Sequence, residues 1–171
     1  MHALISRIAL LLLTLVAAFS INAQDVGVLH LTPLHLQLPP TWQFDGSKNP
    51  IEGKGANGEK MLISKVRRSK PEAPPATIYA EKMAETHMAA YASNKGKAVI
   101  RPVSETPSLP GKKLFSAASE KTALFGGKSY FIQYILANND YSIYITIEGN
   151  GGVSEVIDGF DSIIKTQTWD E

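Results

Sequence analysis

Hydrophobic residues near the C-terminus follow two different periods. Apolar and polar positions alternate through Tyr141–Glu148, which is the period-two pattern of a half-buried strand. The predicted buried face carries Ile143, Ile145 and Ile147. Asn138–Asp140 comes just before this strand and holds residues that tolerate positive φ, so we expect a hairpin turn there.

Beyond the Gly151-Gly152 pair the hydrophobic period becomes that of a helix. Val153–Lys165 has a single apolar stripe, which predicts an amphipathic helix packed against a sheet. The stripe consists of Val153, Val156, Ile157, Phe160, Ile163 and Ile164. A second helix is predicted from Ile78 to Tyr91, with Thr77 as its N-cap and Gly96 near its C′ position. Its apolar stripe consists of Ala80, Met83, Ala84, His87, Met88 and Tyr91.

Four further stretches have the composition of strands. They are Met61–Arg68, Ala98–Pro102, Lys113–Ser119 and Lys128–Ala137. Lys128–Ala137 is apolar on both faces, as is typical of a central strand covered on both sides, and Gly126-Gly127 predicts the turn before it. The elements together predict an α+β fold, an antiparallel β-sheet flanked by helices.

The N-terminal half is less regular. Val26–Leu38 predicts a strand that Pro33 either breaks or places at a sheet edge. Gly46–Gly58 is polar and glycine-rich, and we expect a loop. Within it Gly53–Gly58 matches G-x-G-x-x-G, but a dinucleotide-binding motif follows a strand and opens a helix. Here a strand-like segment comes after the match, so a mobile loop is the favoured interpretation.

Residues 1–23 are predicted to be a signal peptide. Arg7 is followed by Ile8–Phe19, twelve apolar residues, whereas a bilayer-spanning helix needs about twenty. We expect cleavage after Ala23, with cleavage after Ser20 or retention as an anchor as the alternatives. The chain has no cysteine, so the processed end cannot carry a thioether-linked lipid. A periplasmic or secreted protein is predicted.

The remaining residues, 24–171, have the length of one domain. Without Arg7 they hold sixteen basic and sixteen acidic residues. This balance argues against a general nucleic-acid or anionic-membrane binder, which needs a basic excess. We expect no cofactor, no transmembrane segment after cleavage, and a monomer or weak oligomer.

Motifs for catalysis or metal binding are not recognisable. The absence of cysteine excludes thiol catalysis and cysteine-ligated metals. On a continuous strand His30 and His35 would point to opposite faces, so a shared metal would require Pro33 to reset the geometry. His87 is expected to be a hydrogen-bonded residue at the edge of the core.

Asp158 and Asp161 are i, i+3 neighbours on a predicted helix and so form a candidate carboxylate pair. The solvated face of an amphipathic helix normally carries such residues, and this second interpretation is favoured.

Four basic residues and one aromatic residue are candidates for partner binding. Lys65 and Arg67 share one predicted strand face, Arg68 lies on the opposite face, and Lys70 follows in a loop. They would attract an acidic partner or an anionic headgroup, or they would only block edge-to-edge strand pairing. Tyr144 lies on the polar face of its strand, where it is a candidate anchor for a partner.

The order of elements resembles a known family. A strand ends in Leu38–Trp42, with Trp42 expected to plug the core, and a glycine-rich loop leads to Met61–Arg68. The helix Ile78–Tyr91, three or four antiparallel strands and the closing helix Val153–Lys165 follow. This order resembles the Mog1/PsbP-like fold, especially the small exported bacterial proteins grouped with DcrB. The resemblance implies an antiparallel sheet between helices, function through binding, and no shared catalytic residues.

Two classes of function therefore compete. The first is an exported, soluble periplasmic binding or accessory protein that contacts a protein or envelope component and is not an enzyme. The alternative is a small-ligand carrier, which an apolar pocket of roughly several hundred Å³ between helix and sheet would support, or a hydrolase that uses acidic residues.

Overall fold

The computed structural model describes residues 27–96, 98–106 and 111–170 of the 171-residue chain. The predicted signal peptide, residues 1–23, lies outside the described residues. Among the residues that are described, no helix is long and apolar enough to cross a membrane.

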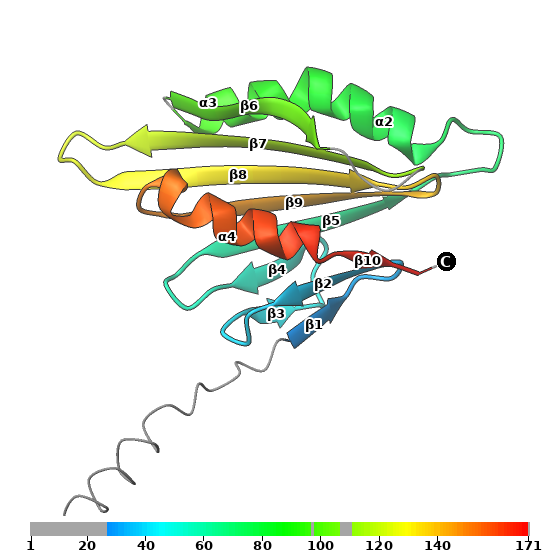
Figure 1. The fold of residues 1–171 in the computed structure, drawn as a ribbon, viewed down its shortest axis with the longest axis horizontal. Helices are drawn as coiled ribbons and strands as arrows, with labels where there is room; N and C mark the ends of the chain where they lie inside the picture. Colours follow the sequence, from blue (N-terminus) through cyan, green and yellow to red (C-terminus); the bar gives the residue numbers. More distant parts are fainter. Residues whose placement is uncertain (1–26, 97, 107–110, 171) are drawn as a thin grey trace, which may run out of the picture.

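Seven strands form a large sheet in the order β3-β4-β5-β9-β8-β7-β6 (Figure 1). All neighbouring strands in it are antiparallel. The strands are β3 (Gln43–Asp45), β4 (Ile51–Lys54), β5 (Lys60–Arg67), β6 (Ala98–Thr106), β7 (Lys113–Thr122), β8 (Lys128–Ala137) and β9 (Tyr141–Asn150). As predicted, β8 is central and buried on both faces.

A small sheet of three strands brings the two ends of the described chain together. Its order is β1-β2-β10, with β1 (Gly27–His30), β2 (Leu34–Leu38) and β10 (Thr168–Trp169). Pro33 breaks the predicted strand into the β1–β2 hairpin, one of the two outcomes expected of it. The antiparallel register then sets His30 opposite His35.

Helix α4 (Val153–Lys165) has the predicted bounds and covers one face of the large sheet (Figure 1). Beneath it lie Ile143, Ile145 and Ile147 of β9, each at most 1% exposed, so the predicted strand faces are confirmed. The β2 leucines and half-buried Trp42 extend the same cluster, as expected of Trp42. This is the main core.

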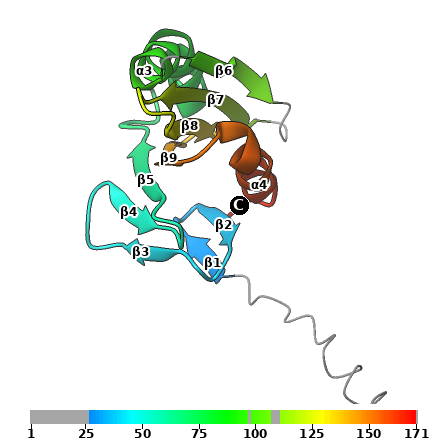
Figure 2. The same ribbon diagram turned by 90° about the vertical axis from the view of Figure 1, so that its left-hand side faces the viewer.

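The second helix lies on the opposite face of the large sheet (Figure 2). It consists of α2 (Ala76–Met83), the π-helical turn η2 (Ala84–Met88) and α3 (Ala89–Lys95). Its buried residues recur at every fourth position: Ala76, Ala80, Ala84, Met88 and Ala92. At about 3.6 residues per turn this repeat would rotate off the sheet, and the wider π turn compensates for that drift.

Two details predicted for this helix are wrong, whereas its end at Gly96 is as expected. His87 and Tyr91 are exposed, because the π turn shifts the buried stripe to the four-residue repeat. The N-cap is Pro75, without a side-chain hydrogen bond, and Thr77 lies inside the helix. Gly96 ends the helix in an extended conformation. Its lack of a side chain allows its backbone to lie close to β7, because an added Cβ would be only 2.6 Å from the Ser119 side chain.

The predicted loop Gly46–Gly58 is wrong in part, because it contains β4. Gly53 pairs with Phe44 and Met61, and the Phe44 ring occupies the space that a Gly53 side chain would need. The glycine is therefore a packing site within a strand. A turn at Gly55–Gly58 and strand β5 follow, so no helix opens after the G-x-G-x-x-G match.

The hairpin turn at Asn138–Asp140 is present, but its backbone differs from the expectation. None of the described non-glycine residues has a positive φ. Instead, the Asn138 side-chain oxygen accepts hydrogen bonds from the backbone N–H groups of Asp140 and Tyr141 at 2.9 and 2.8 Å. An Asx turn thus shapes the loop. The predicted fold class, α+β with an antiparallel sheet flanked by helices, is confirmed.

Candidate functional site: an open groove on the large sheet

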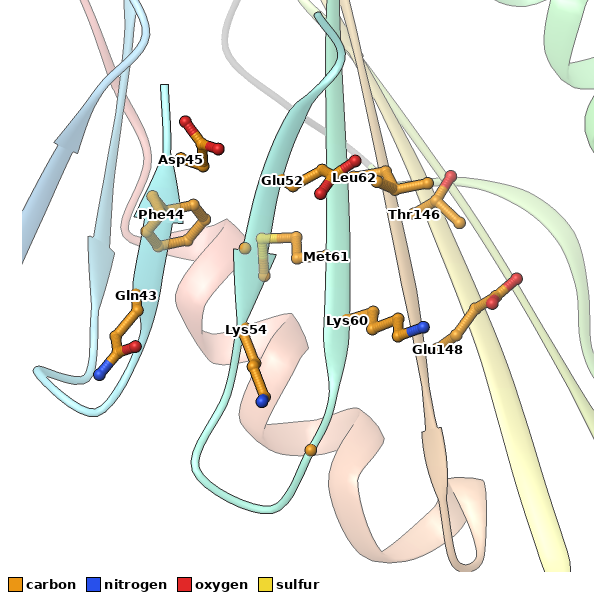
Figure 3. Close-up of a pocket in the computed structure, with 12 residues that line it drawn as sticks. Gln43, Phe44, Asp45, Glu52, Lys54, Lys60, Met61, Leu62, Thr146 and Glu148 are labelled. Carbon is orange, nitrogen blue, oxygen red and sulfur yellow. The ribbon is translucent and has the colours of Figure 1, made fainter. Parts of the chain in front are cut away.

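The α2–α3 helix leaves part of its face of the large sheet uncovered. A hollow of about 700 Å³ lies there over β3, β4, β5 and β9 (Figure 3). Paired residues of adjacent strands form two rows across it. One row is Asp45, Glu52, Leu62 and Thr146, and the other is Gln43, Lys54, Lys60 and Glu148.

A second hollow of about 570 Å³ continues from the first at Thr146 and runs beside the helix. Met83, His87 and Tyr91 line it from the helix, and Gln133, Ile135 and Tyr144 line it from the sheet. We call the two hollows together the sheet groove. It combines apolar and aromatic side chains near the helix with charged ones over β4 and β5.

The floor of the groove contains an acceptor without a donor. The Gln133 amide nitrogen donates to the Thr146 hydroxyl at 3.4 Å. The Gln133 amide oxygen is buried, and no described residue donates to it. Since a buried acceptor without a partner costs about 1–3 kcal/mol, a hydrogen-bond donor that entered the groove would recover stability here.

The charged end of the groove is partly neutralised within the chain. Lys48 lies 2.6 Å from Glu52, and this hydrogen bond raises the pKa of Lys48 above its ordinary value. Lys95 likewise lies 3.0 Å from Glu148. Among the described residues, Lys54 and Lys60 make no ion pair, so they leave cationic positions at this end of the groove.

Tyr144 is the one predicted partner-binding residue that lines the groove. It is half-buried and packs against the cluster beneath the α2–α3 helix. Burial raises the pKa of the Tyr144 phenol, so the hydroxyl stays neutral and can donate a hydrogen bond. Tyr91 lies on the helix, on the opposite side of the hollow from the sheet, and is 40% exposed. The centres of its ring and the Phe131 ring are 5.0 Å apart.

The basic residues predicted to bind a partner are largely engaged within the chain. The Lys65 ammonium donates to the Leu31 and Thr32 carbonyl oxygens at 3.3 and 2.8 Å. Arg68 forms an ion pair of 2.8 Å with Asp140. Two of the four cations therefore hold loops in place.

The other two basic residues remain exposed. The Arg67 guanidinium lies 5.8 Å from the centre of the Tyr141 ring, and Lys70 lies in the loop after β5. Tyr144 pairs with Ser64, so it lies on the opposite face of the sheet from Lys65 and Arg67. The structure does not bring the five predicted residues into one site.

The β1–β2 hairpin places His30 and His35 side by side, unlike on a continuous strand. The two Nδ1 atoms of His30 and His35 are 2.7 Å apart, and His35 Nε2 lies 2.6 Å from Asp170. Pro33 has thus reset the strand geometry as a shared site would require. Nevertheless, no group of three histidine or acidic side chains among the described residues is placed to hold a metal ion.

Asp161 does not lie on a purely solvated helix face. It accepts two hydrogen bonds from Arg101 at 2.8 and 2.7 Å and one from the Tyr134 hydroxyl at 2.7 Å. Burial alone would raise the pKa of Asp161, but these hydrogen bonds outweigh it and the pKa is lowered. Asp158 is exposed as predicted, and Asp161 serves to hold β6 and β8 against α4.

Sequence reasoning did not identify most of the groove. Leu62, Gln133 and Thr146 look like ordinary members of alternating strands, and no motif marks them. One sequence feature could have indicated the groove: Leu62 is an apolar residue on the polar face of β5. It becomes informative only when β9 and β8 are placed beside β5.

Comparison with known proteins supports the fold. No family model and no curated protein matches this sequence. Among solved structures, LpqN, which is involved in cell envelope biogenesis of Mycobacterium tuberculosis, aligns over 88% of both chains with 9% identity and a TM-score of 0.51. With the strand order above, this similarity confirms the predicted Mog1/PsbP-like fold. At this identity it concerns the fold alone.

Two further structures align more loosely. A protein from Bacteroides thetaiotaomicron VPI-5482 has 8% identity and a TM-score of 0.48 over 81% of this chain, which spans 46% of that protein. Cyanobacterial PsbP from Synechocystis sp. PCC 6803 has 12% identity and a TM-score of 0.39, covering 88% of this chain and 96% of that one.

Proposed function

We propose that this chain is an exported accessory protein that binds a partner protein of the cell envelope through the sheet groove, without catalysis. The observation that carries the proposal is the open face of β4, β5 and β9, where a half-buried tyrosine, apolar side chains and charges of both signs occur together. Protein interfaces have this composition, with aromatic residues at the centre and a charged rim.

Export is supported by the N-terminal sequence pattern and by the structural similarity to LpqN, which is involved in cell envelope biogenesis. Fractionation of the host, with the mass of the purified chain, tests it. A mass that corresponds to residues 24–171 or 21–171 in the envelope fraction is the expected result, and full-length protein in the cytoplasm would contradict export.

The distribution of the candidate acids and bases favours binding over hydrolysis. His87 lines the second hollow, where the described lining contains no acidic residue. The acidic residues of the groove, Asp45, Glu52 and Glu148, line the first hollow. Asp161 is engaged by Arg101, and Asp158 is exposed on the other side of the sheet, on α4. A hydrolase that uses a pair of acidic residues needs both carboxyl groups within hydrogen-bond reach of one substrate.

A small-ligand carrier is the second candidate. The hollow between helix and sheet has about 570 Å³ and is lined by Met83, Met88 and Tyr91 among others. This volume lies in the usual range for small-molecule sites, about 300–1,000 Å³. The hollow is open to solvent, whereas a carrier protein usually encloses its ligand. For that reason the carrier function is placed second.

Site-specific photo-crosslinking in the host envelope tests the first proposal. A benzophenone side chain replaces Leu62 in the groove, and a matched control replaces Ile78, which is more exposed and lies on the α2 helix outside the groove lining. We expect a discrete crosslinked protein with the probe at Leu62 only. Tyr144→Ser, which removes the ring without introducing a charge, should abolish it, and circular dichroism checks that the variant stays folded.

Equal crosslinking at both positions, or none at Leu62, would reject the groove as the binding surface. If adducts appear instead at probes replacing Arg67 and Lys70, the basic residues are the contact. For the carrier, native mass spectrometry of the gently purified chain should detect a bound small molecule that Ala90→Trp, which fills the hollow, displaces.

A further inference from the structure

The most exposed large apolar side chains of the described residues lie together at the tip of the β7–β8 hairpin. Leu124 is 94% exposed and Phe125 is 101% exposed. The next highest value among the large apolar residues is 55%, at Ile78. Figure 1 shows this tip projecting from the large sheet beyond the ends of both helices.

The hairpin presents these two side chains on a regular support. β7 and β8 remain paired as far as Thr122 and Lys128. The Ala123 and Gly127 backbones are joined by a hydrogen bond of 2.7 Å, and the Gly126 N–H donates to Ala123 at 3.0 Å. Gly126 has φ +86°, a conformation that favours glycine, so the turn is locally encoded.

The other end of β8 provides an internal comparison. Its turn, Asn138–Asp140, is polar and capped by its own asparagine side chain. Both turns link long antiparallel strands, so hairpin formation does not require apolar residues at a tip. Leu124 and Phe125 make a solvent-exposed pair that the fold itself does not bury.

Lysine residues surround the base of this tip. Lys121 lies on β7 and Lys128 lies on β8. A neighbouring hollow is lined by three lysines, Lys60, Lys95 and Lys121. Glu120 bridges to Lys128, and Glu148 bridges to Lys95. Within the described chain Lys60 and Lys121 form no ion pair, while Glu155 also lies near Lys128. Residues 24–171 carry balanced charge overall, so these two unpaired lysines beside the apolar tip are a local feature of this end of the sheet.

We propose that the β7–β8 tip inserts into the headgroup region of an anionic lipid bilayer, with Leu124 and Phe125 as the wedge and the neighbouring lysines at the lipid phosphates. A convex pair of fully exposed side chains fits a deformable surface, and apolar residues beside lysines are the pattern of interfacial membrane binding. A cleft in a partner protein is the competing occupant.

Two side chains give weak, reversible binding. Replacing both with serine should weaken vesicle partitioning at least about tenfold, given the apolar surface that insertion buries. The tip would thus hold the domain at a membrane surface transiently, which is compatible with an accessory role but does not depend on the sheet groove.

A fluorophore attached at the tip reports the environment of the tip itself. It therefore distinguishes insertion of the tip from membrane binding through the apolar N-terminal segment. The full chain has no cysteine, so Ala123→Cys allows one environment-sensitive label at the tip, and Ile78→Cys serves as the matched control. With vesicles of phosphatidylglycerol and phosphatidylcholine we expect a blue shift only at position 123. The shift should disappear with Leu124→Ser and Phe125→Ser, and weaken several-fold on phosphatidylcholine alone.

No shift at position 123, or equal shifts at both positions, would overturn the proposal. A tip label that responds to an envelope protein but not to vesicles would also overturn it, in favour of a protein cleft. Circular dichroism of the serine variant is expected to be unchanged, because both residues are exposed, and this excludes unfolding as the cause of lost binding.

Discussion

The two faces of strand β5 differ sharply in what covers them. Met61 and Ile63 point to the α4 side and are each 2% exposed. Their neighbours Leu62 and Val66 point to the other side and are 39% and 54% exposed. Both faces carry large apolar residues, so composition alone does not account for the difference.

The covering elements account for it. On one side, α4 and the small sheet β1-β2-β10 close over the strands and form a single apolar cluster. On the other side, the only cover among the described residues is the α2–α3 helix, which packs through alanines on β7, β8 and β9. The first face therefore stabilises the fold, while the second leaves apolar surface free to bind a partner.

The largest expected effect comes from a charge on the closed face. Ile145→Asp should destabilise the domain by more than about 4 kcal/mol, because it buries an unpaired carboxylate. Thr146→Asp, the next residue on the open face, should change stability by less than about 1 kcal/mol. Urea denaturation of both variants measures the contrast, and similar losses would mean that both faces are core.

A smaller effect is expected where the helix approaches the sheet. Ala84 is 1% exposed, and Ala84→Leu should cost about 1–3 kcal/mol by overpacking the alanine contact. Glu85→Leu on the exposed side of the same turn is the control and should be nearly neutral. If thermal unfolding does not distinguish the two, the helix is not packed closely on β7 and β8.

The ion pair between β6 and α4 should make stability depend on pH. The pKa of Asp161 is lowered in the folded state, so its contribution is present above the unfolded pKa and is lost as pH falls through the folded value. At neutral pH Asp161→Asn should lose about 1–2 kcal/mol. The difference from the unsubstituted chain should shrink at about pH 3.

Asp158→Asn is the control for this measurement, because Asp158 is exposed on the same helix. It should leave the acid dependence unchanged. An acid profile of Asp161→Asn that parallels that of the unsubstituted chain would show that another carboxylate dominates acid unfolding.

Much of the fold could be predicted, because long elements with strong periodicity encode themselves locally. Helix Val153–Lys165, the strands at Lys128–Ala137 and Tyr141–Glu148 and both turns around β8 follow from such patterns. Short elements could not. Strands β3, β4 and β10 have two to four residues, and only their pairing partners specify them.

The candidate site could be predicted only at Tyr144. The basic residues stood out because charge is visible in a sequence, yet Lys65 and Arg68 are occupied by loop carbonyls and by Asp140. Such partners lie 33 to 72 residues away along the chain, beyond the reach of any local pattern.

Local hydrophobic periodicity specifies the fold class, the two helices and the buried face of β9, because it acts within a few residues. Tertiary structure alone decided which apolar residues stay exposed. Leu62 and Ile63 are adjacent in the chain and similar in chemistry, and only the arrangement of α4, the small sheet and the α2–α3 helix buries one and leaves the other in the groove.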